Sequence, residues 1–172
     1  PLPTAQSEIF FKSKILSESK IILFGLGGVG SYTAEALARA GIGRITLVDD
    51  DTVSVTNLNR QLCALHSTIG KPKVEVVKER ILDINPLCNV TALQKFYLPE
   101  NSDEFHLETY DYIADAIDTV SAKIDLAEKA QQLNIPLFRV WVRATNLTRH
   151  SSEFPIFQKQ AVARFAALCE EN

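Results

Sequence analysis

The sequence predicts an α/β fold in which a mostly parallel sheet is flanked by helices. Three observations predict it. Short apolar runs alternate with segments in which apolar residues recur at helical spacing. The first apolar run leads directly into a glycine-rich loop that opens a helical segment. The chain has 172 residues, which is a usual length for one domain with one hydrophobic core.

Local patterns place the elements in order along the chain. Apolar and β-branched runs predict strands over residues 20–24, 44–48, 90–96 and 112–114, and a fifth that begins within 135–138. Helical spacing predicts helices over residues 29–40, 73–84 and 121–133. Residues 98–105 are rich in turn-forming and acidic side chains, so we expect a surface connection there.

The loop between the first strand and its helix predicts a nucleotide site. It carries Gly25, Gly27, Gly28 and Gly30, which allow a tight turn and close backbone approach, while the helix N-terminus offers N–H groups to phosphates. Asp49 ends the second strand, where an acid usually accepts hydrogen bonds from a ribose. Both features suit NAD and ATP equally, so they leave the nucleotide open.

The segment after Asp49 discriminates between the two nucleotides. It reads DDDTVSVTNLNRQ and is followed by GKPK. A triphosphate carries about four negative charges and needs cations aimed at its β- and γ-phosphates, whereas an NAD site has no use for such a cluster. Arg60 and Lys73 can supply the cations and Asn57 a neutral donor, and Asp51 belongs to the same candidate site. Lys73 begins a helix, where a cation is unfavourable, so we expect an anionic partner for it.

A carboxylate after the fourth strand completes the candidate site. Asp118 follows the carboxyl end of that strand, the side on which open α/β sheets bind ligands. Mg²⁺ prefers oxygen ligands and often takes only one or two from protein, so Asp118 is the candidate metal ligand. The alternative is that Asp118 caps the next helix. Asp115 is close by but lies within the apolar end of the strand.

Composition and cysteine usage narrow the class of protein. No apolar run approaches the roughly 20 residues of a membrane span, and the N-terminus lacks a signal-peptide pattern, so we expect a cytoplasmic protein. A net charge of −3 does not favour nucleic acid, so a tRNA partner would need a local basic patch or a partner subunit. Cys63, Cys88 and Cys169 form no CxxC pair, which predicts buried thiols rather than a zinc site.

Together these motifs resemble a known family. The segments GLGGVGS, VDDDTVSVTNLNRQ, GKPKVEVVKERILDINP and DAIDTVSAK are similar, in this order, to the adenylating family of ThiF, MoeB and the ubiquitin-activating enzymes. Within it, ALHSTIGKPKVEVVKERILDINP and YDYIADAIDTVSAKIDL most resemble the group that dehydrates threonylcarbamoyladenosine in tRNA. The resemblance covers residues 19–138 and implies a Rossmann-like, ATP-binding half-domain.

The resemblance implies a role for each matching residue. The four glycines would line the phosphates and Asp49 would bind the ribose. Asn57, Arg60 and Lys73 would contact and polarise the phosphates, and Asp118 would hold Mg²⁺. Arg60, Lys73 and Asp118 are therefore the candidate catalytic residues.

The resemblance also implies a reaction, a substrate and an assembly. A homodimer would use ATP to adenylate the threonyl carboxylate of the modified adenosine in tRNA, and the activated acyl group would close into a ring with loss of AMP. Two other functions stay open. One is an activating enzyme for a ubiquitin-like sulfur-carrier protein, with a sulfur-transfer or carrier protein as partner. The other is a non-catalytic or NAD-linked dinucleotide-binding module.

The sequence departs from the family near its N-terminus. Related enzymes carry an arginine there that reaches into the partner subunit's ATP site, whereas no arginine precedes Arg39. Lys12 or Lys14 could take its place only as a point charge, without the bidentate fork of a guanidinium.

A second departure begins after residue 138, where the family pattern stops. Shifted by one base, the codons for residues 140–149 permit Met-Gly-Thr-Gly-Asn-Lys-Leu-Asp-Pro, which is typical of the family's continuation. We therefore divide the chain into an ATP-binding domain over 1–138, with an N-terminal arm over 1–18, and an aberrant tail over 139–172 that is hypothesised to be translated out of frame. Because the family's second half is missing, we expect weak ATP binding and impaired catalysis.

Overall fold

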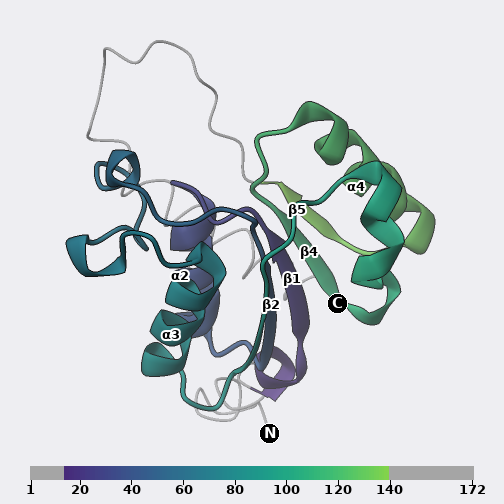
Figure 1. The fold of residues 1–172 in the computed structure, drawn as a ribbon. Helices are drawn as coiled ribbons and strands as arrows, with labels where there is room; N and C mark the ends of the chain where they lie inside the picture. Colours follow the sequence, from purple (N-terminus) through teal and green to yellow (C-terminus); the bar gives the residue numbers. More distant parts are fainter. Residues whose placement is uncertain (1–13, 140–172) are drawn as a thin grey trace, which may run out of the picture.

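The computed structural model describes residues 14–139 and contains a five-stranded sheet whose neighbouring strands all run parallel (Figure 1). The strands are β1 (Lys20–Phe24), β2 (Arg44–Val48), β3 (Asn89–Leu93), β4 (Tyr112–Asp115) and β5 (Leu137–Arg139). Their order across the sheet is β3-β2-β1-β4-β5. The strand order reverses between β1 and β4, which is where open α/β sheets bind ligands.

Helices cover both faces of the sheet, as predicted. The helices α2 (Gly30–Ala40) and α3 (Lys73–Ile84) pack on one face, and α4 (Val120–Leu133) packs on the other (Figure 1). The predicted α/β class with a Rossmann-like half-domain is therefore confirmed.

The central strand β1 contributes to both cores because its side chains alternate between the two faces. Ile21 and Leu23 pack with α2 and α3, whereas Ile22 and Phe24 pack with α4. All four side chains are buried. Burial on both faces explains why this strand is a continuous apolar run rather than an alternating one.

The predicted bounds are confirmed for β1, β2 and α3, and the differences in β3 and β4 follow from the strands with which they pair. The third strand was predicted to reach residue 96, but β3 ends at Leu93, whose register partner Val48 is the last residue of β2. Within residues 14–139, β2 offers no residue beyond Val48 with which the chain after Leu93 could pair. The fourth strand extends one residue further than predicted because Asp115 pairs with Phe24.

The connection over residues 98–105 is more than a surface loop. Pro99–Phe105 forms a 3₁₀ helix (η3), and Phe105 is buried. Its ring lies 5.4 Å from that of Phe24 and 5.2 Å from that of Tyr97, between centroids. The Tyr97 hydroxyl donates to Asp125 Oδ2 of α4 at 2.6 Å. The prediction of a purely surface connection is therefore wrong, because these aromatic rings complete the core beneath α4.

A short helical segment at residues 14–18 lies against the amino end of β2. The Gly43 N–H donates to the Leu16 carbonyl at 3.0 Å, and a Cβ on Gly43 would lie 1.7 Å from the Ser17 carbonyl oxygen. Gly43 therefore permits this close approach. Lys14 is exposed at this end of the sheet, opposite the glycine loop, and Lys12 lies outside the described residues.

The remaining predictions concern cysteines, membranes and the tail. Cys63 and Cys88 are buried free thiols, as predicted, whereas Cys169 and the rest of residues 140–172 lie outside the described residues. Between residues 14 and 139, no helix is long and apolar enough to cross a membrane. Over the same range, no three His, Cys, Asp or Glu side chains gather in a way that could hold a metal ion.

Candidate nucleotide-binding site

The predicted site residues follow the carboxyl ends of three neighbouring strands. The glycine loop follows β1, Asp49 follows β2, and the loop with Asp118 follows β4. These three strands are adjacent at the point where the strand order reverses. The sheet topology therefore brings together segments that are far apart in the sequence, at the edge where this type of fold binds ligands.

Two of the four loop glycines are required by the protein's own backbone. A Cβ on Gly30 would lie 1.8 Å from the Gly25 carbonyl oxygen, and one on Gly25 would lie 2.6 Å from the Ala116 carbonyl oxygen. Gly25 also has a φ of +84°, which an L side chain rarely adopts. These two glycines close the turn and let the loop after β4 pack against it.

The other two glycines face the segment that follows β2. A Cβ on Gly27 would lie 3.8 Å from Gln61 Nε2, and one on Gly28 would lie 3.5 Å from Arg60 Cγ. Both distances are ordinary contacts, so the fold itself does not demand glycine at these positions. A ligand that approaches the backbone closely would demand it.

The segment 60–62 is tied to the start of α2 through Ser31. The Ser31 hydroxyl donates to the Gly27 carbonyl at 2.8 Å and accepts the Leu62 N–H at 3.1 Å. Arg60 is exposed, and its Nη1 donates to the carbonyl of Thr56 at 2.9 Å. The backbone therefore holds the base of the Arg60 side chain beside Gly28. Sequence reasoning missed Ser31 and Gln61, although both lie within the quoted motifs.

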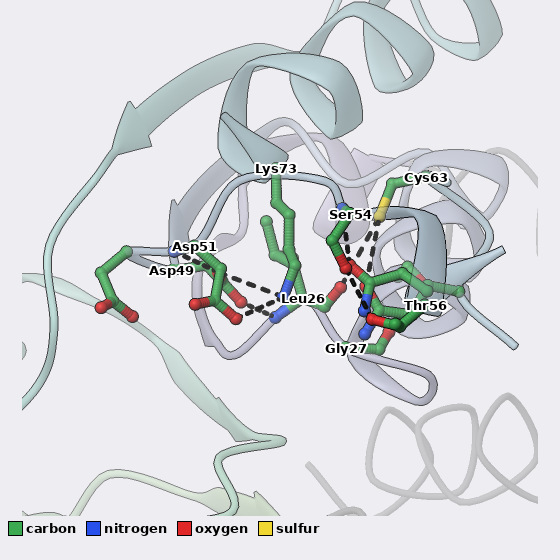
Figure 2. A network of polar contacts seen from close by, with 12 residues as sticks. Leu26, Gly27, Asp49, Asp51, Ser54, Thr56, Cys63 and Lys73 are labelled. Atoms are coloured by element: carbon green, nitrogen blue, oxygen red, sulfur yellow. Dashed lines mark hydrogen bonds and ion pairs between the residues drawn. The ribbon is translucent and has the colours of Figure 1, made fainter. Parts of the chain in front are cut away.

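Asp49 is the acid predicted to bind ribose, and the fold holds it rigidly. Its Oδ2 accepts the Leu26 N–H at 2.6 Å, and its Oδ1 accepts the Asp51 N–H at 3.0 Å (Figure 2). Burial raises the pKa of Asp49 above its ordinary value, while the Leu26 N–H and the Lys73 ammonium act in the opposite direction. Each carboxylate oxygen has a second lone pair, so Asp49 can still accept from ribose hydroxyls.

Lys73 begins a helix, where a cation needs an anionic partner, and the structure supplies that partner from within the chain. Its Nζ donates to Asp51 Oδ2 at 2.6 Å and lies 3.8 Å from Asp49 Oδ1 (Figure 2). The Lys73 ammonium is therefore at the same edge of the sheet as Asp49, the acid predicted to bind ribose.

Asn57 is placed differently from the other polar residues of the site. It is buried, and its Oδ1 accepts the Ser54 N–H at 3.0 Å in the turn that begins the segment after β2. That oxygen shapes the loop, whereas the Asn57 amide remains a candidate donor to a ligand.

Asp118 lies in the loop between β4 and α4, two residues beyond Ala116, which contacts the glycine turn. The cap of α4 is Thr119, so the alternative role of Asp118 as the helix cap is wrong. Asp118 is exposed, and its carboxylate makes no hydrogen bond or ion pair within residues 14–139. One exposed carboxylate beside the glycine loop fits the way in which proteins usually hold Mg²⁺, with one or two carboxylates and oxygens of a bound phosphate.

Asp115, by contrast, is engaged in the protein. It is 0% exposed, and the Lys123 Nζ donates to both of its oxygens, at 3.1 and 3.2 Å. Its Oδ1 also accepts the Ile117 N–H at 3.1 Å. This pair fixes the start of the loop that carries Asp118. Sequence reasoning treated Asp115 only as a neighbour, because the partner lies eight residues further along the chain.

The parallel sheet, the glycine turn and the acid after β2 define a Rossmann-like nucleotide-binding domain. The sequence profile of the ThiF family matches residues 9–152, and the chain belongs to this family.

Individual relatives narrow the similarity. The tRNA threonylcarbamoyladenosine dehydratase of Bacillus subtilis is 52% identical over 122 residues, which is 71% of this chain and 48% of the relative. A molybdopterin-synthase adenylyltransferase of Salmonella typhimurium is 33% identical over 128 residues, covering 74% of this chain and 51% of the relative. The chain therefore spans about half the length of the curated relatives it matches.

A solved structure agrees with the sequence relatives. The Escherichia coli tRNA N6-threonylcarbamoyladenosine dehydratase, crystallised in complex with ATP, superimposes with a TM-score of 0.73 at 45% identity. The match covers 75% of this chain and 53% of that one. The similarity therefore extends from the sequence to the fold, over three quarters of this chain.

Proposed function

We propose that this chain is the nucleotide-binding half of an ATP-dependent adenylating enzyme whose substrate is the threonyl carboxylate of threonylcarbamoyladenosine in tRNA. The observation that carries the proposal is the juxtaposition of a glycine turn, a ribose-type acid and the Lys73 ammonium at one edge of the sheet. An NAD site needs the first two, whereas the cation suits the phosphates of ATP. The high identity to tRNA threonylcarbamoyladenosine dehydratases supports the choice of substrate.

Each residue then has a defined task in the reaction. Gly27 and Gly28 leave room for the phosphates at the start of α2, and Asp49 accepts hydrogen bonds from the ribose. Arg60, Lys73 and Asn57 bind the phosphate oxygens and stabilise the charge that develops there. Asp118 would hold Mg²⁺, which would neutralise part of the charge of the phosphates.

The chemistry is an activation followed by ring closure. A carboxylate oxygen of the substrate attacks the α-phosphorus of ATP, the bond to the β-phosphate oxygen breaks, and pyrophosphate leaves. A nucleophilic atom of the same modified side chain then attacks the acyl carbon, AMP departs with the former carboxylate oxygen, and a proton is released. Relative to the starting nucleoside, one water equivalent has been removed.

We further propose that the functional unit is a homodimer and that residues 139–172 are translated out of frame. The homodimer follows from the family resemblance, which implies that an arginine of the partner subunit closes the nucleotide site. No arginine precedes Arg39 here, so Lys12 or Lys14 would take that place as a point charge. After residue 138 the chain lacks the segments typical of the family's continuation, although the ThiF profile runs on to residue 152, and the shifted frame permits those segments. This supports the frame hypothesis. It requires that the source DNA keep the shifted frame open, and a stop codon within the family-like stretch would refute it.

The second candidate is an activating enzyme for a ubiquitin-like sulfur-carrier protein, which the 33% identity to a molybdopterin-synthase adenylyltransferase favours. Both candidates adenylate a carboxylate, so they differ in the acyl substrate. The first candidate acts on a carboxylate carried by tRNA, and the second acts on the carboxylate at a protein C-terminus.

ATP–pyrophosphate exchange tests the proposed function. The chain and a version continued in the shifted frame are each assayed with tRNA that carries threonylcarbamoyladenosine, with the same tRNA lacking the modification, and with a ubiquitin-like carrier protein. We expect the frame-restored version to exchange only with the modified tRNA, and the chain as written to be at least about tenfold slower. Exchange that depends on the carrier protein would favour the second candidate, and equal rates for the two versions would contradict the expected impairment.

A further inference from the structure

Lys73 is a buried cation that the fold holds beside two carboxylates. The residue is 3% exposed, and its Nζ lies 2.6 Å from Asp51 Oδ2 and 3.8 Å from Asp49 Oδ1 (Figure 2). A buried ammonium needs a negative partner, because its removal from water is otherwise strongly unfavourable. The two carboxylates differ in what else they bind, and this difference decides which of them can yield to a ligand.

Asp49 cannot move away from its place. Its side chain is 8% exposed, and its two oxygens accept N–H groups of Leu26 and Asp51. The side chain of Asp51 is 64% exposed, and within residues 14–139 the hydrogen bonds of its carboxylate go to Lys73 alone. The Asp51 carboxylate can therefore be displaced from Lys73 and return to water at little cost, whereas that of Asp49 cannot.

The backbone keeps Asp51 and Lys73 close together even without their side-chain contact. The Lys73 N–H donates to the Asp51 carbonyl at 3.0 Å, and Thr52 and Pro72 form an antiparallel bridge. Breaking the ion pair would therefore leave the two ends of the 51–72 loop held together by their backbones. The ammonium also has three N–H donors, of which Asp51 takes one, while Asp49 lies beyond hydrogen-bond distance.

We propose that Asp51 is a positioning residue that serves as the resident anion on Lys73. It holds the Lys73 Nζ beside Asp49 while no nucleotide is bound, and it gives way to a phosphate oxygen of ATP without touching the nucleotide itself. The inference rests on the proposed function, because it needs a nucleotide with phosphates within reach of Lys73. It replaces the direct nucleotide contact that the sequence motif suggested for Asp51.

Equilibrium titrations of ATP and adenosine test this role. The proteins are the unsubstituted chain, Asp51→Asn, Lys73→Met and the double variant. We expect Asp51→Asn to bind ATP about threefold to tenfold more tightly, because a competing anion has been removed, and to bind adenosine within about twofold of the unsubstituted chain. In the Lys73→Met background the same substitution should give no gain, so the double-mutant cycle reports the coupling.

Asp50→Asn is the matched control, because Asp50 is an exposed neighbour and the substitution removes the same charge. We expect it to leave the ratio of ATP to adenosine affinity unchanged. Weaker binding of both ligands by Asp51→Asn would assign Asp51 to the ribose or the metal and overturn the inference. The inference would also be overturned if Asp51→Asn tightened ATP binding in the Lys73→Met background, or if Asp50→Asn tightened it equally. Either result would show that the substitution acts by removing general charge repulsion. If the unsubstituted chain binds NAD in preference to ATP, the proposed function fails instead.

Discussion

Gly30→Ala is expected to destabilise the domain by at least about 3 kcal/mol, whereas Gly28→Ala should change the free energy of unfolding by less than about 1 kcal/mol. A Cβ on Gly30 would meet the Gly25 carbonyl oxygen at 1.8 Å, so the turn must open. The nearest atom to a Cβ on Gly28 is Arg60 Cγ at 3.5 Å, an ordinary contact. Urea unfolding followed by circular dichroism measures both values.

Gly28→Ala, the less destabilising of the two substitutions, should be the one that impairs ATP binding directly. We expect Gly28→Ala to remain folded and to bind ATP at least about tenfold more weakly, because its methyl group occupies the space of a phosphate. Adenosine, which lacks phosphates, should bind with unchanged affinity. Equal ATP affinity for Gly28→Ala and the unsubstituted chain would show that this face of the loop holds no phosphate.

Asp49→Ala is expected to weaken ATP, AMP and adenosine alike, by at least about thirtyfold. The ribose is common to all three ligands, and the Asp49 carboxylate also orders the loop through the Leu26 N–H at 2.6 Å. Lys73→Met should instead weaken ATP more than adenosine, because the proposed function assigns Lys73 to the phosphates, which adenosine lacks. Calorimetric titration with the three ligands distinguishes the two patterns.

Asp49→Asn is the matched control for this substitution. It keeps one oxygen that can accept a hydrogen bond, so its affinities should lie between those of the unsubstituted chain and Asp49→Ala. Thermal unfolding of each variant separates loss of the site from loss of the fold. A selective loss of ATP with adenosine binding retained would place Asp49 beside the phosphates and contradict its ribose role.

The sequence predicted those parts of the fold that local patterns determine. The bounds of β1, β2 and α3 follow from apolar spacing, which does not depend on distant neighbours. The end of β3 depends on where β2 ends, and the burial of Phe105 depends on the space beside Phe24 and beneath α4. Such features arise only when the chain is assembled.

The candidate site shows the same division. The motifs correctly placed Asp49, Lys73 and the glycines at one edge of the sheet. They could not separate the glycines that the backbone requires from those where a Cβ would make only ordinary contacts, because Ala116 and Arg60 approach the loop from distant parts of the chain. Nor could they identify Asp51 as the partner of Lys73, because the two residues stand at opposite ends of a long loop and meet only when it closes.

If the glycine turn and the cations beyond β2 together form an ATP site, the chain should bind ATP in preference to NAD. Titration of the chain with each nucleotide in the presence of Mg²⁺ measures this preference. We expect heat of binding and a raised Tm with ATP, and neither with NAD at the same concentration. Binding of NAD with no response to ATP would contradict this expectation.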